Sequence, residues 1–373
     1  MKIQSIRESI IENLPIDEGK KKILNRRLNK LARDPKGFLK GSYNKKSKQI
    51  LSKTPVKYKG KNNYTVVSAV YNVEKYLGDY FKSLVEQSLN FKKHIQLIMV
   101  DDGSTDGSAE IIKEWQKKYP NNIKYVYKKN GGQASARNLG MTYVKTQWVT
   151  FIDPDDFVDL NYFQKVDSFI SNEPNVSLVS CPFVFYFEDT QKVSNSHPLR
   201  YRFNDKTNKY KISKMGKNIQ LSVNSAFFKM SEILQHNISF NEYIRPNFED
   251  AKFVGDYTIR IDQHKEAAFI KGTSYFYRKR SDGTSTLDGS WNKVSLYSDV
   301  LSRGCLSMLE EAYDKFNYVP KHVQRTVLYH LSWYFKYLVN KDESINILDD
   351  EKKDLFLALL YRIFDFIDEE TIL

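Results

Sequence analysis

The sequence predicts an α/β fold, in which a mostly parallel sheet is flanked by helices, followed by a helical C-terminal region. Two observations support this prediction. From Tyr64 onward, short apolar segments alternate with segments of helical spacing. Strands separated by helices of about 10 to 15 residues imply right-handed crossovers and parallel strands with helices on both faces. Beyond Gly289 the apolar and aromatic residues recur with helical spacing throughout.

The expected strands and helices follow one another in regular alternation. The strands are expected at residues 64–71, 95–100, 123–128 and 148–152. The helices between them are expected at residues 73–88, 108–119 and 134–144. Ligands of such a sheet bind beyond the carboxyl ends of its strands. The polar clusters that follow these strands are therefore the candidate functional residues.

The formal charge of +13 comes from the start of the chain. Residues 1–61 hold 18 Lys and Arg against five Asp and Glu, and the remainder holds 40 residues of each sign. We therefore expect no nucleic-acid binding surface on the main domain. Residues 20–33 have the spacing of a basic amphipathic helix, which either packs on its own domain or contacts an anionic membrane. Residues 40–61 are polar and Lys-rich, as expected of a linker.

Cysteine content and hydropathy indicate the compartment. Cys181 and Cys305 are too few and too far apart for a disulfide framework or a zinc site, which favours a reducing environment. We find no apolar stretch of the roughly 18 to 20 residues that a spanning helix needs, and no signal-peptide core. We expect a cytoplasmic protein, either free or peripheral at the inner face of the membrane.

Three parts are expected along the chain. Residues 1–61 form a basic, partly helical segment with a linker, residues 62–289 form the α/β domain, and residues 290–373 form the helical region. The final "DEETIL" follows helical sequence without a loop or cap. On that basis we expect the natural chain to continue beyond Leu373.

The first polar cluster is "DDGSTD", behind the apolar run "LIMV". A turn into the next helix explains part of it, with Asp102 and Ser104 capping backbone amides and Gly103 supplying an unusual dihedral angle. The second carboxylate, from Asp101, adds nothing to that capping. The aspartate pair is therefore a candidate for ligand binding.

The second cluster, "KKNGGQASARNLG", combines a glycine loop with a helix whose first turns carry Arg137. A helix N-terminus beside a guanidinium group suits a phosphate. The glycine spacing matches neither the GxGxxG dinucleotide fingerprint nor the P-loop. This segment therefore indicates an anion without naming a cofactor.

The third cluster is "FIDPDDFVD", directly after a buried strand. Asp153 and Asp155 form a D-x-D pair of hard oxygen ligands that can reach one divalent ion, and Pro154 fixes the turn between them. We expect Asp156 to cap the local turn or face an acceptor, and Asp159 to be solvated. Clustered carboxylates need open solvent or a cation, and a second strand-end aspartate pair favours the cation.

Together these motifs resemble the family 2 glycosyltransferases of the GT-A fold. The family pattern runs through Pro-x-Tyr-Asn, Asp-Asp-Gly-Ser-x-Asp, Ala-Arg-Asn-x-Gly and Asp-x-Asp-Asp. This sequence has "AVYN" at 69–72, "DDGSTD" at 101–106, "SARNLG" at 135–140 and "DPDD" at 153–156. The resemblance covers roughly residues 64–285. One departure is Ala69, where the family usually has proline.

The resemblance implies a nucleotide-sugar site at these motifs. Tyr71 and Asp102 are expected to contact the nucleobase and the ribose, with the backbone of Ala69 beside them. Arg137 is expected to face the diphosphate or the donor sugar. The expected donor is a UDP-sugar.

The resemblance also implies a metal ion and a base. Asp153 is expected at the ribose or the metal, and Asp155 as a ligand of Mg²⁺ or Mn²⁺. Similar enzymes carry the base in a Glu-Asp pair, which "RPNFEDAKFV" supplies as Glu249 and Asp250. Asp250 is the expected base and Glu249 its support at the acceptor. The alternative is that both acids only stabilise a helix N-terminus.

The segment "YFYRKRSDGTST" follows further along the chain. Family members often carry Tyr-x-Tyr-Arg-x-Arg here, before a loop that closes on the diphosphate, so Arg278 and Arg280 are candidates for that clamp. The alternative is surface charge on an edge strand.

These expectations combine into one function. The chain is expected to be an inverting, metal-dependent hexosyl- or N-acetylhexosaminyltransferase acting on a glycan or lipid-linked glycan. The acceptor would belong to a capsule, teichoic-acid-like or lipopolysaccharide polymer. Two alternatives remain open, namely nucleotidyl or phosphoryl transfer on the same fold, and polyanion binding through the basic N-terminus.

Overall fold

The computed structural model describes residues 58–204, 207–280, 289–338 and 347–372. All of these residues lie in one compact unit, Thr54–Leu373. The basic helix expected at residues 20–33, and most of the linker expected at residues 40–61, lie outside the described residues. Within them, the helices are too short or too polar to cross a membrane.

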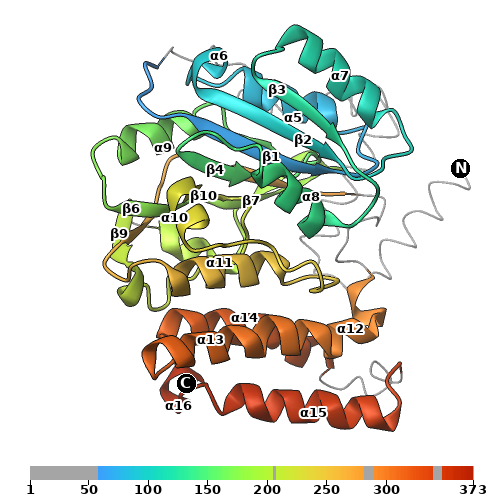
Figure 1. Cartoon of the computed structure of the whole chain (residues 1–373), viewed down its shortest axis with the longest axis vertical. Helices are drawn as coiled ribbons and strands as arrows, with labels where there is room; N and C mark the ends of the chain where they lie inside the picture. The colour runs from blue at the N-terminus through green and yellow to red at the C-terminus, as the bar shows by residue number, and fades with distance from the viewer. Residues whose placement is uncertain (1–57, 205–206, 281–288, 339–346, 373) are drawn as a thin grey trace, which may run out of the picture. The chain divides into compact units, whose positions relative to one another are not determined.

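The described residues form a main sheet of eight strands (Figure 1). Its strands are β1 (Tyr64–Val70), β2 (Ile95–Asp101), β3 (Ile123–Tyr127), β4 (Trp148–Phe151), β6 (Val176–Ser180), β9 (Asn208–Lys211), β10 (Ala226–Lys229) and β11 (Glu266–Phe269). The order across the sheet is β3-β2-β1-β4-β10-β6-β11-β9. The first four strands of this order are the four expected from the sequence, and all of them are parallel.

The other half of the main sheet is mixed. β10 runs antiparallel to both β4 and β6, and β9 runs antiparallel to β11. β11 is parallel to β6. Consequently β4, β6 and β11 all point the same way, and their carboxyl ends lie along one edge of the sheet.

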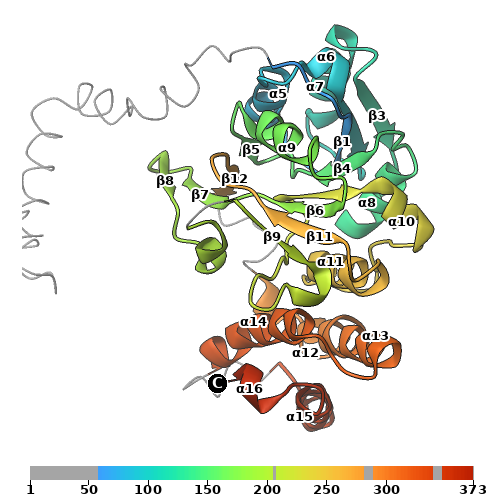
Figure 2. The ribbon, with the colours of Figure 1, turned by 90° about the vertical axis from the view of Figure 1, so that its left-hand side faces the viewer.

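Helices cover both faces of the main sheet, as expected (Figure 2). The helices of this part are α5 (Leu77–Val85), α6 (Phe91–His94), α7 (Ser108–Lys118), α8 (Gln133–Met141), α9 (Tyr162–Ile170), α10 (Met230–Gln235) and α11 (Glu249–Arg260), with short 3-10 turns η1 (Pro198–Phe203) and η2 (Ile212–Lys214). Successive strand residues point to opposite faces, so Val66 packs with α5, α7 and α9, and Val67 packs with α8, α10 and α11.

The helix expected at residues 73–88 begins four residues late, at Leu77. Residues 73–76, which were expected to form its first turn, lead from β1 to α5 and lie beside the start of α7. The amide of Val73 donates to Oγ of Ser108 over 3.0 Å. The amide of Val73 is therefore satisfied by a side chain at the start of α7 rather than by a hydrogen bond within α5.

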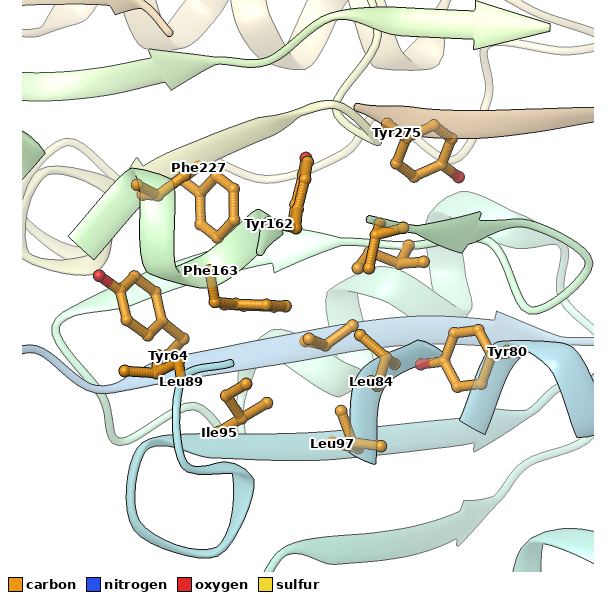
Figure 3. Close-up of a cluster of buried hydrophobic side chains, with 14 of the residues drawn as sticks. Tyr64, Tyr80, Leu84, Leu89, Ile95, Leu97, Tyr162, Phe163, Phe227 and Tyr275 are labelled. Carbon is orange, nitrogen blue, oxygen red and sulfur yellow. The ribbon is translucent and has the colours of Figure 1, made fainter. Parts of the chain in front are cut away.

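Aromatic side chains dominate the core between the sheet and α9 (Figure 3). Tyr64 and Phe227 come from β1 and β10, and Tyr162 and Phe163 come from α9. The rings of Tyr64 and Phe163 meet edge to face with centroids 5.4 Å apart. Each such side chain contributes about 1.5 to 3 kcal/mol by burial, so this cluster fixes α9 on the sheet.

A second, four-stranded sheet that we did not predict lies beside the main one. Its strands are β5 (Phe157–Val158), β7 (Phe183–Phe187), β8 (Lys192–Ser194) and β12 (Tyr275–Lys279). The order β5-β12-β7-β8 places β12 between two neighbours. The alternative reading of residues 275–286 as an edge strand is therefore wrong for β12, and residues 281–288 lie outside the described residues.

The C-terminal region is helical, as expected. Its elements are η3 (Ser290–Asn292), α12 (Val294–Tyr297), the π-helix η4 (Val300–Leu306), α13 (Ser307–Phe316), α14 (Lys321–Leu338), α15 (Asp350–Phe364) and α16 (Glu369–Ile372). η4, α13 and α14 contact α11, and they share one apolar cluster with it (Figure 1). The C-terminal helices thus support the helix that begins with the candidate base.

One buried carboxylate anchors the start of β1. Asp167 on α9 accepts hydrogen bonds from the amides of Lys61 and Asn62, over 3.0 and 2.9 Å, and from the hydroxyl of Tyr64, over 2.9 Å. Its side chain is fully buried. This group therefore fixes the first strand of the sheet to the helix that covers it.

Replacing this anchor should destabilise the fold. We expect Asp167→Ala to lower the free energy of unfolding by about 2 to 4 kcal/mol, because two amides and a hydroxyl lose their acceptor. Urea unfolding measures the change. The exposed Asp314→Ala should change it by less than about 0.5 kcal/mol. Equal effects of the two variants would contradict the anchoring role.

Candidate active site

The candidate site lies where the strand order reverses, beyond the carboxyl ends of β1, β2 and β4 (Figure 1). Tyr71 follows β1 and is 52% exposed, which leaves its ring open to a planar ligand. Ala69 lies in β1 beside Val100 of β2. Asp102 follows β2 and Asp153 lies just beyond β4. The structure thus brings together the residues expected at the nucleotide.

Of the two aspartates at the end of β2, the one that caps the following turn is not the one expected. Asp101, not Asp102, supports the turn, since its Oδ1 accepts from the amide of Ser104 over 2.8 Å. Asp102 reaches across to the glycine loop, where it accepts from the amides of Gly131 and Gly132 over 2.9 and 2.7 Å. Asp101 is the last residue of β2, so Asp102 is the first residue beyond the strand and can reach the glycine loop.

The glycine loop is held tightly at this position. Lys128 forms an ion pair with Asp102 at 2.7 Å, so the carboxylate receives three donors. A carboxylate has about four acceptor positions, which leaves one for a ligand hydroxyl. Gly132 has a φ of 90°, a conformation that residues with a side chain rarely adopt, and it precedes α8.

Arg137 on α8 is the centre of the site. Its side chain is only 1% exposed, and it meets carboxylates from two other parts of the chain. Nη2 lies 2.9 Å from Asp153, and Nη1 lies 2.6 Å from Asp250 and 3.7 Å from Glu249. In this arrangement the guanidinium group is enclosed by acids, and the contact with the diphosphate or sugar that is expected of Arg137 stays a prediction. Arg137 joins the D-x-D segment to the candidate base.

The acidic pair opens α11, as expected. Burial and the nearby charge of Asp250 raise the pKa of Glu249 to about 8, although Arg137 opposes this. Burial also raises the pKa of Asp250 above its ordinary 3.8, again against the effect of Arg137. Oδ2 of Asp250 accepts from the amide of Val223 over 3.2 Å. Near neutral pH Glu249 is therefore largely protonated, and Asp250 is a stronger base than a free aspartate.

An unusual backbone conformation places this pair. Phe248, the residue before α11, has a φ of 79°. Its ring packs on the C-terminal helices, with its centroid 4.5 Å from that of His330. A Cβ on Gly304 would lie 2.7 Å from the ring, so only a glycine leaves room for it there. The π-helix η4 thus provides the space that Phe248 needs.

The D-x-D segment forms an acidic cluster. Asp153, Asp155 and Asp156 each offer a carboxylate oxygen within 4.8 Å of the others. Burial, and then the charge of Asp153, raise the pKa of Asp155. Arg280 contacts Oδ2 of Asp155 at 2.7 Å. Among the described residues, none donates a hydrogen bond to the other carboxylate oxygen of Asp155, Oδ1. The cluster therefore has an open oxygen and three carboxylates close together, an arrangement that suits a divalent cation.

Asp156 and Asp159 differ from expectation. Asp156 caps no local turn, because its fully buried carboxylate accepts from the hydroxyl of Tyr275 over 2.5 Å and the amide of Arg278 over 2.7 Å. It fixes β12 to the acidic cluster. Asp159 is half-buried rather than solvated, and burial raises its pKa to about 6.

Two arginines, one in β12 and one directly after it, lie at the same cluster. Arg278 is 6% exposed, and it pairs with Asp79 at 2.8 Å and donates to the carbonyl of Asp155 over 2.7 Å. Arg280 pairs directly with the carboxylate of Asp155. Arg278 is thus buried and bonded within the protein, and Arg280 is the better candidate for contact with a ligand.

Sequence reasoning missed one residue at the centre of the site. Asn224 precedes β10, and its Nδ2 donates to Asp153 over 2.6 Å while its Oδ1 accepts from Arg137 over 3.2 Å. It lies in a segment without a motif, "LSVNSAFF". Only the tertiary arrangement could reveal it, since a lone asparagine before a strand usually makes a turn.

Comparison with known proteins identifies relatives of this chain. The profile of the family described as "Glycosyl transferase family 2" matches residues 65–234. The minor teichoic acid biosynthesis protein GgaA of Bacillus subtilis (strain 168) is 30% identical over 311 residues, which cover 83% of this chain and 68% of GgaA. GgaB of the same strain is 32% identical over 312 residues, which cover 83% of this chain and 33% of GgaB. The chain thus spans a third of the length of GgaB.

A solved structure shows the same fold. Residues 1–349 of S. aureus TarS, in complex with UDP-GlcNAc, superpose with a TM-score of 0.64 at 17% identity. The match covers 83% of this chain and 82% of that one. The expected GT-A fold is therefore confirmed.

Removing the guanidinium group of Arg137 should destabilise the protein in a pH-dependent way. We expect Arg137→Met to lower the free energy of unfolding by about 3 to 5 kcal/mol at pH 8, because three acids lose their partner. Without the guanidinium group, the pKa values of Glu249 and Asp250 in the folded variant rise further above those of the unfolded chain. The folded variant therefore loses stability as pH rises and these acids ionise. The deficit should therefore shrink toward pH 5.

Urea unfolding at the two pH values measures both effects. The matched control is Arg362→Met, whose pair with Glu310 is largely exposed and is worth less than about 1 kcal/mol. A loss for Arg137→Met that is the same at both pH values would mean that the guanidinium group acts only by packing.

Proposed function

Because the chain belongs to glycosyl transferase family 2, we propose that it transfers a sugar from a UDP-sugar to a hydroxyl group of a cell-surface polymer, with inversion at the anomeric carbon. The observation that carries this proposal is the meeting of Asp153 and Asp250 at Arg137. One acid belongs to the donor side and the other to the acceptor side. The relatives that act in teichoic acid biosynthesis, by their names, and the complex of TarS with UDP-GlcNAc support the choice of acceptor and donor.

The donor side is built from the ends of β1, β2 and β4. The exposed ring of Tyr71 would stack on the nucleobase, and the remaining acceptor position of Asp102 would take a ribose hydroxyl. Arg280, beside Asp155, would meet the diphosphate, and Arg278 would hold the strand that carries it. The clamp expected of both arginines thus divides into one contact and one support.

The acceptor side is the start of α11. The acceptor oxygen attacks the anomeric carbon, the bond from that carbon to the diphosphate breaks, and the proton passes to Asp250. Burial keeps the pKa of Asp250 above its ordinary value, which strengthens it as a base. Glu249, protonated near neutral pH because burial raises its pKa to about 8, can donate a hydrogen bond to the acceptor. One base and no enzyme nucleophile suffice, which gives inversion.

A divalent ion, Mg²⁺ or Mn²⁺, fits the acidic cluster. Asp155 would hold it through the oxygen that Arg280 leaves open, with Asp153 beside it. Such an ion would neutralise the charge of the departing diphosphate. Asp156 is committed to Tyr275 and β12 and is not part of this proposal as a ligand.

The organisation and location of the protein are part of the proposal. Residues 1–61 would be a basic segment that contacts an anionic membrane through residues 20–33, at its cytoplasmic face. Residues 62–289 would be the catalytic domain, supported by the helices of residues 290–373. Family membership favours glycosyl transfer over nucleotidyl transfer and over polyanion binding as the main activity.

Loss of the base should abolish transfer but not donor binding. We expect Asp250→Asn to lower kcat by about 10² to 10⁴, because no group takes the proton of the acceptor. Release of UDP from a panel of UDP-sugars, with cell-wall polymer as acceptor, measures turnover, and calorimetry with UDP measures binding. Asp314→Asn, an exposed change on α13, should leave both unchanged. Full turnover by Asp250→Asn would refute the mechanism.

Turnover should require a divalent metal held by Asp155. Chelation with EDTA should stop UDP release, and Mn²⁺ or Mg²⁺ should restore it. Asp155→Asn should raise the metal concentration needed for half-maximal binding, measured by calorimetry with UDP present, by at least about tenfold. Asp159→Asn, four residues along the same segment, should keep the wild-type requirement. Metal-independent turnover would show that the cluster serves another purpose.

A further inference from the structure

A cavity with several polar side chains on its wall lies away from the acidic cluster. Its volume is about 220 Å³, and it is formed where η1 packs beside the residues that follow β6 and β11. The donors on its wall include His197, Arg200, Arg202 and Thr273.

Arg202 is a buried cation that faces this cavity without an acidic partner. Its residue is 5% exposed. Nε donates to the carbonyl of Leu199 over 3.0 Å, and Nη1 donates to the carbonyl of Ile219 and to Oε1 of Gln220. Within the described ranges, no acceptor bonds to Nη2 and no carboxylate pairs with the guanidinium group. Burial lowers the pKa of Arg202 to about 10, yet it stays charged near neutral pH.

Two further donors on the wall have spare capacity. Oγ1 of Thr273 is buried, and among the described residues it has no hydrogen-bond partner. Nδ1 of His197 accepts from the amide of Leu199 over 3.1 Å, and burial lowers the pKa of His197 to about 4. A neutral histidine that accepts at Nδ1 carries its proton on Nε2. The wall therefore offers unused donors.

The charges around the cavity favour an anion. Arg200 is exposed and Lys271 also lines the wall, where its Nζ donates to the carbonyl of Asn204 over 2.8 Å. The opposing charge is Asp159, whose pKa is raised to about 6 by burial. The guanidinium group of Arg202 has neutral acceptors and the rings of Phe203 and Phe269 beside it, and among the described residues no anionic partner. A phosphate that accepts two hydrogen bonds from it would supply the missing negative charge.

The cavity and the active site lie at the same edge of the main sheet. β4 ends at the acidic cluster, and β6 and β11, which run parallel to it, end at the cavity. These strands are two and three positions from β4, so the two sites are roughly 10 to 14 Å apart by strand spacing. β5 runs from Asp155 toward Asp159 on the cavity wall. An extended acceptor could therefore occupy both.

We propose that this cavity is an anion subsite, which binds a phosphate group of the acceptor polymer while a hydroxyl of the same polymer lies at Asp250. This inference rests on the proposed function for the identity of the ligand. The binding of phosphate by Arg202 and Thr273 rests on the cavity itself.

Calorimetry with inorganic phosphate tests the subsite. The full chain is saturated with UDP and Mg²⁺, so that phosphate cannot enter the donor site. Wild type should bind phosphate, and Arg202→Gln should weaken it at least about tenfold, because it removes a charge-assisted contact. Thr273→Val should weaken binding about fivefold by removing one hydrogen bond. Lys117→Ala, an exposed change on α7, should bind like wild type.

Arg200→Glu keeps the test decisive if Arg202→Gln does not fold. Arg200 is on the surface, so the reversal should preserve folding and weaken phosphate binding at least about fivefold. Absence of phosphate binding by wild type at millimolar concentrations would overturn the subsite. So would wild-type affinity in both Arg200→Glu and Thr273→Val.

Kinetics with a synthetic glycerol-phosphate oligomer test the acceptor assignment. Arg200→Glu and Thr273→Val should raise the KM for the oligomer at least about threefold, with little change in kcat or in UDP release without acceptor. An unchanged KM in variants that have lost phosphate binding would overturn the assignment to the acceptor. If wild type releases no UDP from any UDP-sugar, the proposed function fails while the phosphate measurement still decides the subsite.

Discussion

The site depends on one buried guanidinium group. Arg137 lies within ion-pair distance of Asp153, Glu249 and Asp250, which come from the end of β4 and the start of α11. Asp153 and Asp250 would repel each other in a buried setting without a cation between them, and burial beside Asp250 already raises the pKa of Glu249 to about 8. The arginine thus allows the end of β4 and the start of α11 to approach each other, and burial still keeps the pKa of Asp250 above its ordinary value.

The position of α11 is the second requirement, and the C-terminal helices supply it. Phe248 takes a left-handed conformation just before Glu249, and its ring packs against His330 and over Gly304. Residues with a side chain seldom adopt such a conformation unless their surroundings hold them there. The helical region therefore holds the start of α11 in place, although no residue of it is proposed to touch the substrate.

Local pattern predicted the parallel half of the sheet and the polar clusters at the ends of its strands, because alternating strands and helices and strand-end motifs are local signals. It could not predict the second sheet, whose strands are short and pair across distant segments. Nor could the local sequence pattern predict the direction in which individual side chains point. Asp101 caps the turn after β2 in place of Asp102, which bonds to the glycine loop, and the carboxylate of Asp156 points inward to Tyr275. Asn224 carries no motif at all, so only packing reveals it.

A double-mutant cycle between Arg137 and Asp250 tests the central claim most directly. The free energy of unfolding is measured at pH 8 for wild type, Arg137→Met, Asp250→Asn and the double variant. If the guanidinium group offsets repulsion among the acids, removing one acid should recover part of the loss, with a coupling energy of about 1 to 3 kcal/mol. Additive effects of the two substitutions would contradict the account.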